Sequence, residues 1–114
     1  MRISKELVKG STSLLVLSVM EKEAMYGYQI IREIELRSEK VFSLNEGTLY
    51  PILHALEKEK FLESYWDEKE TARNRKYYRM TEKGRTELAR KREEWNGFSI
   101  AVTRVAHGTV SQYG

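Results

Sequence analysis

The fold is decided by the stretch NEGTLYPILHALEKEKFLESYW, residues 45–66, in which the spacing of apolar side chains changes from a helical to a strand period. In its first half Leu49, Leu53 and Leu56 follow one another at intervals of four and three, which places them on one face of a helix. After Lys60 the period becomes two, which is typical of a half-buried strand. The stretch therefore predicts a helix that leads directly into a β-strand.

The start of this helix is open to two interpretations. Asn45 is a favourable N-cap, and Glu46 then lies in the positive first turn. Pro51 has no backbone N–H and clashes with the preceding turn when it lies deep in a helix. The helix either begins at Asn45 with an irregular first turn or begins at Thr48.

Downstream of this strand, a polar loop leads to residues 75–80, where aromatic and polar residues mix as they do in residues 61–66. Two such arms on either side of a polar loop predict an antiparallel hairpin. Tyr77 and Tyr78 point to opposite faces of the hairpin, so one is expected in the core and the other is expected to be exposed. Tyr65 and Trp66 are expected to divide in the same way on the other strand.

Two helices are predicted upstream of the deciding stretch. Residues 5–21 form the first, and its segment LLVLSVM is apolar nearly all round, which indicates burial on more than one side. Residues 26–37 form the second, with a wide apolar stripe. Residues 22–25 form a link so short that the two helices must pack against each other.

Thr81 is expected to cap a fourth helix, which extends to about Ala106. The predicted order is three helices, a hairpin and a further helix, so the chain is expected to be mostly α with a small β hairpin. Three helices and a hairpin make a winged helix-turn-helix, to which the long last helix is an addition.

The last helix carries an apolar stripe that needs a partner. Its residues repeat at intervals of seven in one row, with a second row offset by three, as in a coiled-coil seam. A compact three-helix core offers this stripe no partner, so a second subunit is expected to cover it together with the first helix. We expect residues 1–80 to form the winged helix-turn-helix domain and residues 81–114 the dimerisation helix and a short tail. The predicted dimer interface consists of Leu14, Leu88, Trp95, Phe98, Val102 and Val105.

Charge is distributed unevenly along the chain. The net charge is +3 over 114 residues, but the segment from Arg73 to Arg92 holds nine basic residues against two acidic ones, a local charge of +7. Such a field attracts polyanions, although a charged run can also be simply the solvated face of a helix. The chain has no Cys, which fits a reducing cytoplasm, and it has no apolar run near the ~20 residues that span a bilayer.

Catalysis is not expected. With no Cys present, the remaining candidate groups are His54 and His107, which are isolated in the sequence. No Ser lies in a nucleophile-elbow pattern, and there is no glycine-rich phosphate loop. The carboxylates alternate with Lys and Arg, as on solvated helix faces. We therefore expect no catalytic residue, no metal site and no cofactor.

Several short motifs are spread over the chain: MYGYQI at 25–30, NEGTLYP at 45–51, Leu56-Glu57, Trp66 and RKYYRMT at 75–81. Together they resemble the PadR family of bacterial transcriptional regulators. The combination of GTLYPxLxxLE with RKYYxxT is much more specific than a general helix-turn-helix pattern. The similarity extends over about residues 5 to 106, and the single C-terminal helix resembles the smaller subgroup of the family. Two departures are the lack of Gly near Lys60 and Ala72-Arg73 where a Gly-Arg pair is common.

The resemblance implies a homodimer that binds double-stranded DNA at a pseudo-palindromic operator. The third helix would enter the major groove, the wing would contact backbone or minor groove, and the last helix would form much of the dimer interface. Most members of the family repress transcription, and several respond to small aromatic compounds. The resemblance therefore implies a repressor that a small aromatic effector releases.

Polar residues of the third helix and the wing are the candidate DNA contacts. Helix N-termini and their side chains can hydrogen-bond base edges and phosphates, and cations on a protruding hairpin suit phosphates or a narrow minor groove. The predicted contacts are Asn45, Thr48, Tyr50, His54, Arg73, Arg75 and Lys76.

Four of these residues have a plainer alternative. Asn45 can serve only as an N-cap, and Tyr50 can be a half-buried packing residue. His54 can be merely solvent-exposed, and Lys76 can face back along its strand. The sequence leaves both interpretations open for each residue.

Trp95 is the candidate effector site, because an aromatic residue at this place in the small subgroup lies near the dimer centre. The neighbouring Gly97 leaves room beside the ring for a flat ligand. The alternative is that Trp95 only packs the interface. For the whole chain, the alternative to a DNA-binding regulator is a winged-helix module that binds proteins and no DNA.

Overall fold

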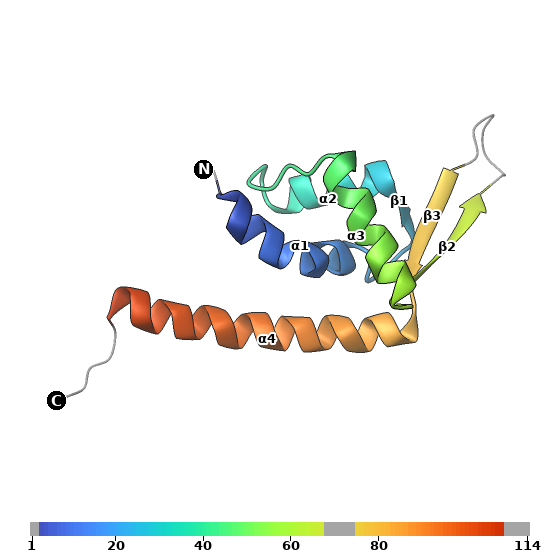
Figure 1. The fold of residues 1–114 in the computed structure, drawn as a ribbon. Helices are drawn as coiled ribbons and strands as arrows, with labels where there is room; N and C mark the ends of the chain where they lie inside the picture. Colours follow the sequence, from blue (N-terminus) through green and yellow to red (C-terminus); the bar gives the residue numbers. More distant parts are fainter. Residues whose placement is uncertain (1–2, 68–74, 109–114) are drawn as a thin grey trace.

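The computed structural model describes residues 3–67 and 75–108. The order of the helices and strands confirms the expected mostly α chain, with three helices, a hairpin and a long last helix (Figure 1). The small sheet makes this a winged helix-turn-helix with a C-terminal extension. The elements are α1 (Lys5–Val19), β1 (Met25–Tyr26), α2 (Gly27–Arg37), α3 (Glu46–Lys58), β2 (Leu62–Asp67), β3 (Arg75–Met80) and α4 (Glu82–His107).

The sheet has three strands, in the order β1-β3-β2, and every neighbouring pair is antiparallel. The hairpin of β2 and β3 was predicted, but β1 was not. In β1, Met25 pairs with Tyr78 and Tyr26 pairs with Tyr77. Because β1 has only two residues, it is too short to show a strand period in the sequence. The sequence-based helix over 26–37 therefore begins at Gly27.

Side-chain caps begin three of the helices. The Asn45 side chain accepts a hydrogen bond from the Thr48 N–H at 2.9 Å, so α3 begins at Glu46 and the open question of its start is settled. Thr81 caps α4 in the same way, accepting from the Gly84 N–H at 3.0 Å, as predicted. Ser4 caps α1, which ends at Val19 rather than at the expected Glu21.

Pro51 lies inside α3, six residues after its cap. The hydrogen bond that Pro51 cannot make would go to the carbonyl of Gly47, in the first turn of the helix. The turn before it is held by the cap instead, because the N–H groups of Thr48 and Leu49 both reach the Asn45 carbonyl, at 3.2 and 3.0 Å. A proline is tolerated here because the capped first turn does not depend on its N–H.

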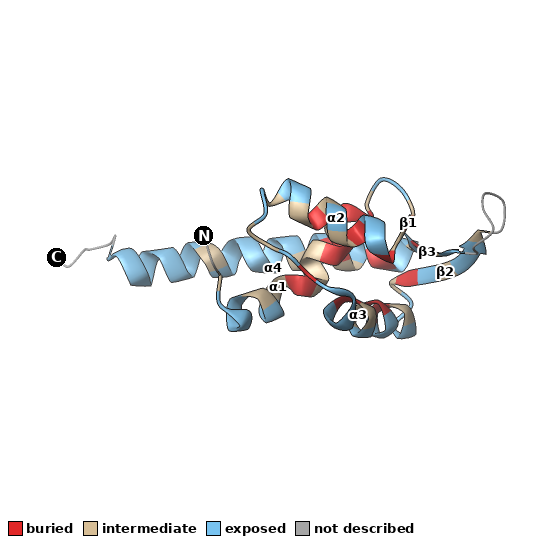
Figure 2. Ribbon diagram, turned by 90° about the horizontal axis from the view of Figure 1, so that it is seen from above, coloured by how far each residue is buried: buried red, intermediate tan, exposed pale blue. Residues whose placement is uncertain are grey.

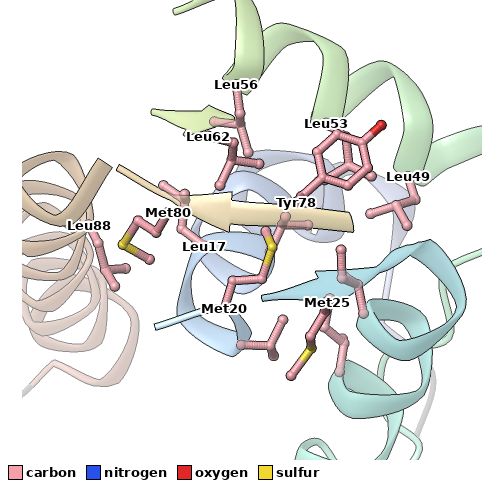
Figure 3. Close-up of a cluster of buried hydrophobic side chains, with 14 of the residues drawn as sticks. Leu17, Met20, Met25, Leu49, Leu53, Leu56, Leu62, Tyr78, Met80 and Leu88 are labelled. Atoms are coloured by element: carbon pink, nitrogen blue, oxygen red, sulfur yellow. The ribbon is translucent and has the colours of Figure 1, made fainter. Parts of the chain in front are cut away.

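The core lies between the three helices and the inner face of the sheet (Figures 2 and 3). Leu17 of α1, Ile30 of α2 and Leu49 and Leu53 of α3 are completely buried. Tyr78 of β3 is 1% exposed and lies among them, and burial raises the pKa of its hydroxyl. Each helix therefore contributes its apolar face to a single cluster.

The hairpin extends past this core. Of its two adjacent tyrosines, Tyr78 is buried, as expected, whereas Tyr77 on the outer face is half-buried rather than exposed. The same expectation for Tyr65 and Trp66 is wrong, because both are exposed, at 37% and 58%. They lie on the outer half of β2, beyond the reach of the helices, where neither face of the hairpin is covered.

The position of Leu88 differs from the predicted dimer interface. Leu88 was assigned to the interface with Trp95 and Val102, but it is only 2% exposed within its own chain. Figure 3 shows it beside Met80, at the α4 end of the core. The first turns of α4 lie against the winged-helix domain, so the seven-residue row begins in the core and becomes available to a partner only further along the helix.

The long helix α4 runs along α1 and continues past it, so that the molecule measures 67 × 31 × 21 Å (Figure 1). Glu21, just after α1, joins Arg92 through two hydrogen bonds of 2.9 and 3.2 Å. Arg85 donates to the backbone carbonyl of Glu21 at 3.2 Å. These contacts hold the first half of α4 to the domain. No helix in the described part of the chain is long and apolar enough to cross a membrane.

Candidate nucleic-acid interface

The first turn of α3 is exposed and polar. Asn45 and Thr48 both lie open to solvent. The oxygen of the Asn45 side chain is used by the cap, while its amide NH₂ group can still donate to a phosphate or a base edge. The cap interpretation of Asn45 is thus correct, and the cap does not compete with a DNA contact.

Tyr50 is half-buried and lies over Gly27, the first residue of α2. Its hydroxyl is so close to the Gly27 Cα that any β-carbon there would overlap it. The ring therefore packs the two helices of the helix-turn-helix together. His54 is exposed one turn later on α3, with its ring centroid 6.4 Å from that of Tyr50. The DNA contacts predicted for these two residues stay predictions.

The wing cations lie over aromatic rings. The guanidinium carbon of Arg75 is 4.5 Å from the centroid of the Tyr26 ring, on the outer face of the sheet. The Lys76 ammonium is 5.6 Å from the centroid of the Tyr78 ring, so this side chain turns back along its strand. Arg73, the third predicted wing contact, lies outside the described residues.

A cluster of aromatic rings on the outer face was missed by the sequence analysis. Tyr77 stacks on Tyr65 at 5.7 Å between centroids and meets Tyr26 edge-on at 5.4 Å. Arg79 extends over Tyr65 at 5.0 Å and forms an ion pair with Glu63 at 2.7 Å. The alternation of β3 already places the side chains of Arg75, Tyr77 and Arg79 on one face, but the role of Tyr26 depends on β1.

The basic run from Arg73 to Arg92 is not a single patch. Its second half lies on α4, where Arg90 binds Glu87 at 2.8 Å and Arg92 binds Glu21 at 2.9 Å. The hydrogen bond from Arg90 holds the pKa of Glu87 below its ordinary value. Carboxylates therefore neutralise much of the charge on α4, whereas Arg75 and Lys76 of β3 lie over aromatic rings of the sheet.

The start of α3 and the strands of the hairpin lie on the same side of the molecule. In Figure 1 the first turn of α3, the end of β2 and the start of β3 lie in the upper part of the view, and α4 lies at the bottom. A surface that combines an exposed helix start with a basic hairpin is complementary in shape and charge to a DNA groove. Within the described residues, no cluster of His, Asp and Glu could hold a metal ion.

The second half of α4 exposes an apolar stripe. Trp95 is 46% exposed, Phe98 57% and Val102 45%, while Val105 near the end is 87% exposed. A groove of about 430 Å³ separates this helix from α1, and Leu14 and Trp95 lie on its two sides. The rings of Trp95 and Phe98 are 6.0 Å apart at their centroids. The structure thus places Trp95 at an open groove that is large enough for a small molecule.

The chain is similar to known regulators over most of its length. The model of the transcriptional regulator PadR-like family matches residues 16–90. An uncharacterized protein of Lysinibacillus sphaericus is 31% identical over 93 residues, which cover 82% of this chain and 85% of that one.

Solved structures of transcriptional regulators are also similar to this chain. A transcriptional regulator from Clostridium thermocellum has a TM-score of 0.79 and 28% identity, covering 94% of this chain and all of its own. A PadR family transcriptional regulator from Eggerthella lenta has a TM-score of 0.76 and 30% identity, covering 89% of this chain and 82% of its own. The geometry of α3, the wing and α4 is thus shared with these regulators, and this chain belongs to the PadR-like family of transcriptional regulators.

Proposed function

We propose that this protein is a homodimeric, sequence-specific DNA-binding repressor that acts in the cytoplasm and has no catalytic role. One observation carries the proposal: the exposed start of α3 and the basic strand β3 lie away from α4, and it is α4, along the other side of the molecule, that carries the exposed apolar stripe (Figure 1). One side can then face DNA while the other binds a second subunit.

On the DNA side, α3 is proposed to enter the major groove with its first turn. Asn45 and Thr48 are placed to meet base edges or phosphates there, and the helix N-terminus itself favours a phosphate. The wing would place Arg75 and Lys76, together with Arg73, along the backbone. In a symmetric dimer the two copies of α3 would lie about one DNA turn apart, roughly 34 Å, which requires a pseudo-palindromic operator.

On the dimer side, residues 81–114 are proposed to join two copies. The second half of α4 is exposed on all sides in the single chain, and an isolated helix of that length is marginal in water. Covering Trp95, Phe98, Val102 and Val105 with a partner would remove this apolar surface from water. Leu14 borders the same groove and would join the interface, whereas Leu88 belongs to the core of its own chain.

The groove beside Trp95 is the proposed site of a flat aromatic effector. An exposed indole next to a second ring offers a stacking surface, and the groove of about 430 Å³ lies within the range of small-molecule sites. Because the groove lies between α1 and α4, an occupant would change how the helix meets its partner and thus the spacing of the two DNA-binding domains.

A gel-shift with the DNA upstream of the chain's own gene tests the proposal. We expect a specific complex that survives excess competitor DNA, contains two chains, and weakens steeply with salt. Absence of any complex at low salt would instead favour the alternative, a winged-helix module that binds proteins.

A further inference from the structure

A second cavity lies on the other flank of α1 from the Trp95 groove. Its volume is about 1000 Å³, and it is bounded by the first half of α1, the link between α2 and α3, and the first half of α3. Ser13 is the one residue that borders both spaces. The two cavities are therefore separate sites on the molecule, and the second is not part of the proposed effector groove.

The cavity is lined by apolar, hydroxyl-bearing and cationic side chains. Its apolar part is formed by Val8 of α1, Phe42 and Leu44 of the link and Ile52 of α3. Lys5 and Lys9, one turn apart on α1, also line it, and none of the described lining residues carries a carboxylate. A space with an apolar side and two cations at one end fits a ligand with a hydrocarbon body and an anionic head.

The link that forms one wall also positions the recognition helix. It begins with Glu39 and Lys40 at φ values of 52° and 69°, in the left-handed region that L-residues occupy only at a cost in free energy. The link is anchored by Leu44, which is 8% exposed, and leads directly to the cap residue Asn45. Hydrogen bonds hold the start of the link, from the Lys40 N–H to the Glu35 carbonyl at 2.8 Å and from the Val41 N–H to the Ser38 carbonyl at 3.0 Å. Further along, the side chains of Phe42 and Leu44 form part of the cavity wall.

The cavity also shares residues with the proposed DNA surface. Asn45 and Thr48 line it as well as forming the exposed first turn of α3. A ligand in the cavity and a DNA strand at α3 would therefore compete for the same two side chains and for the same electrostatic field.

We propose that this cavity binds a straight-chain fatty acid, with its carboxylate at Lys5 and Lys9 and its chain against Val8, Phe42 and Ile52, and that binding lowers the affinity for DNA. The binding step depends only on the cavity. Its effect on DNA rests on the proposed function and is tested separately.

Calorimetric titration of the full chain with decanoate, below its micelle concentration, tests the binding step. We expect one decanoate per chain, and weaker binding of decanol, which has the same chain without the charge. Replacing both lysines, Lys5→Gln with Lys9→Gln, should weaken decanoate about fivefold. The charge-matched control Lys22→Gln with Lys58→Gln, at exposed sites outside the cavity, should stay within twofold.

Three results would overturn the proposal. The first is decanoate affinity that is unchanged by the Lys5 and Lys9 substitutions. The second is affinity that is lost on Trp95→Leu, since the ligand would then occupy the other groove. The third is the absence of decanoate binding while the Lys5 and Lys9 substitutions weaken DNA binding, since the two lysines would then contact DNA.

The effect on DNA is measured by titrating decanoate into a preformed complex of the protein with labelled DNA. Release of DNA by the unmodified protein, shifted to about fivefold higher decanoate in the double variant, supports the coupling. Binding of decanoate without any change in DNA affinity contradicts it. A chain that binds decanoate but no DNA would contradict the proposed function and leave the fatty-acid site supported.

Discussion

The ring of Tyr50 in α3 covers Gly27, the first residue of α2, so closely that no β-carbon fits between them. Tyr50 thereby sets the distance between the two helices of the helix-turn-helix at the point nearest the proposed DNA surface.

This contact predicts that Gly27→Ala destabilises the fold by about 1–3 kcal/mol, the usual cost of forcing an extra carbon into a packed site. The matched control is Gly10→Ala in the middle of α1, where a β-carbon meets nothing within 4 Å. That change should stabilise the protein by about 0.5–1 kcal/mol, because alanine favours a helix. Urea unfolding of both variants measures the difference, and equal effects would refute the role of Tyr50.

The wing assignment predicts a change in the salt dependence of DNA binding. Each phosphate contact adds about 0.9 to the slope of log K against log salt, so replacing Arg73, Arg75 and Lys76 by Ala should lower it by up to about 2.7. A charge-matched triple on α4, with Arg90, Lys91 and Arg104 replaced by Ala, should leave the slope nearly unchanged. Equal losses in the two triples would mean that only net charge matters.

Substitutions in the two halves of the apolar row on α4 are expected to have different effects. Val102→Glu places a charge on the exposed stripe, so it should shift the protein to monomer while each chain stays folded. Leu88→Ala should instead cost about 2–5 kcal/mol of unfolding free energy, because it opens a hole in the core of its own chain. Light scattering reports the first effect and thermal unfolding the second. A dimer that survives Val102→Glu would argue against the seam.

The ion pair between Glu21 and Arg92 predicts a small dependence of stability on pH. The hydrogen bond from Arg92 holds the pKa of Glu21 below its ordinary value. A lowered folded-state pKa contributes stability above the unfolded pKa of about 4.3, and this contribution disappears as the pH falls through the folded value.

Both side chains are about half exposed, so the contribution should stay below about 1 kcal/mol. Arg92→Met should remove it at pH 7 and have no effect at pH 2. Unfolding free energies at the two pH values measure this, with Arg104→Met, on the far half of α4, as the control. A loss that is the same at both pH values would show that Arg92 contributes through packing alone.

The effector groove predicts a fluorescence signal from Trp95. The chain has two Trp residues, so the measurement uses a Trp66→Phe background in which Trp95 is the only indole. Flat aromatic dyes should quench this emission and lower the affinity for DNA, because stacking on the indole and occupation of the groove occur together. Quenching that persists after Leu14→Arg, on the opposite wall of the groove, would place the dye elsewhere.

Local patterns in the sequence were sufficient for the order of elements. The period of the leucines in α3, the alternation of the hairpin and the cap residues Asn45 and Thr81 all act within a few positions of the chain. Their helices and strands lie close to the predicted bounds for that reason. The motifs of the family were equally visible, because they are themselves short runs of residues.

Contacts between segments that are distant in the sequence could be identified only in the tertiary structure. The strand β1 forms only because β3 pairs with it, and that pairing brings Tyr26 into contact with Arg75. Leu88 has the spacing of an interface residue, yet the turn of the chain into α4 brings it against the core. Likewise, the basic run is one segment in sequence but divides in space, because its second half forms ion pairs with Glu21, just after α1, and with Glu87 of α4. Periodicity determines which face of an element is apolar, but only the packing of the whole chain determines what that face meets.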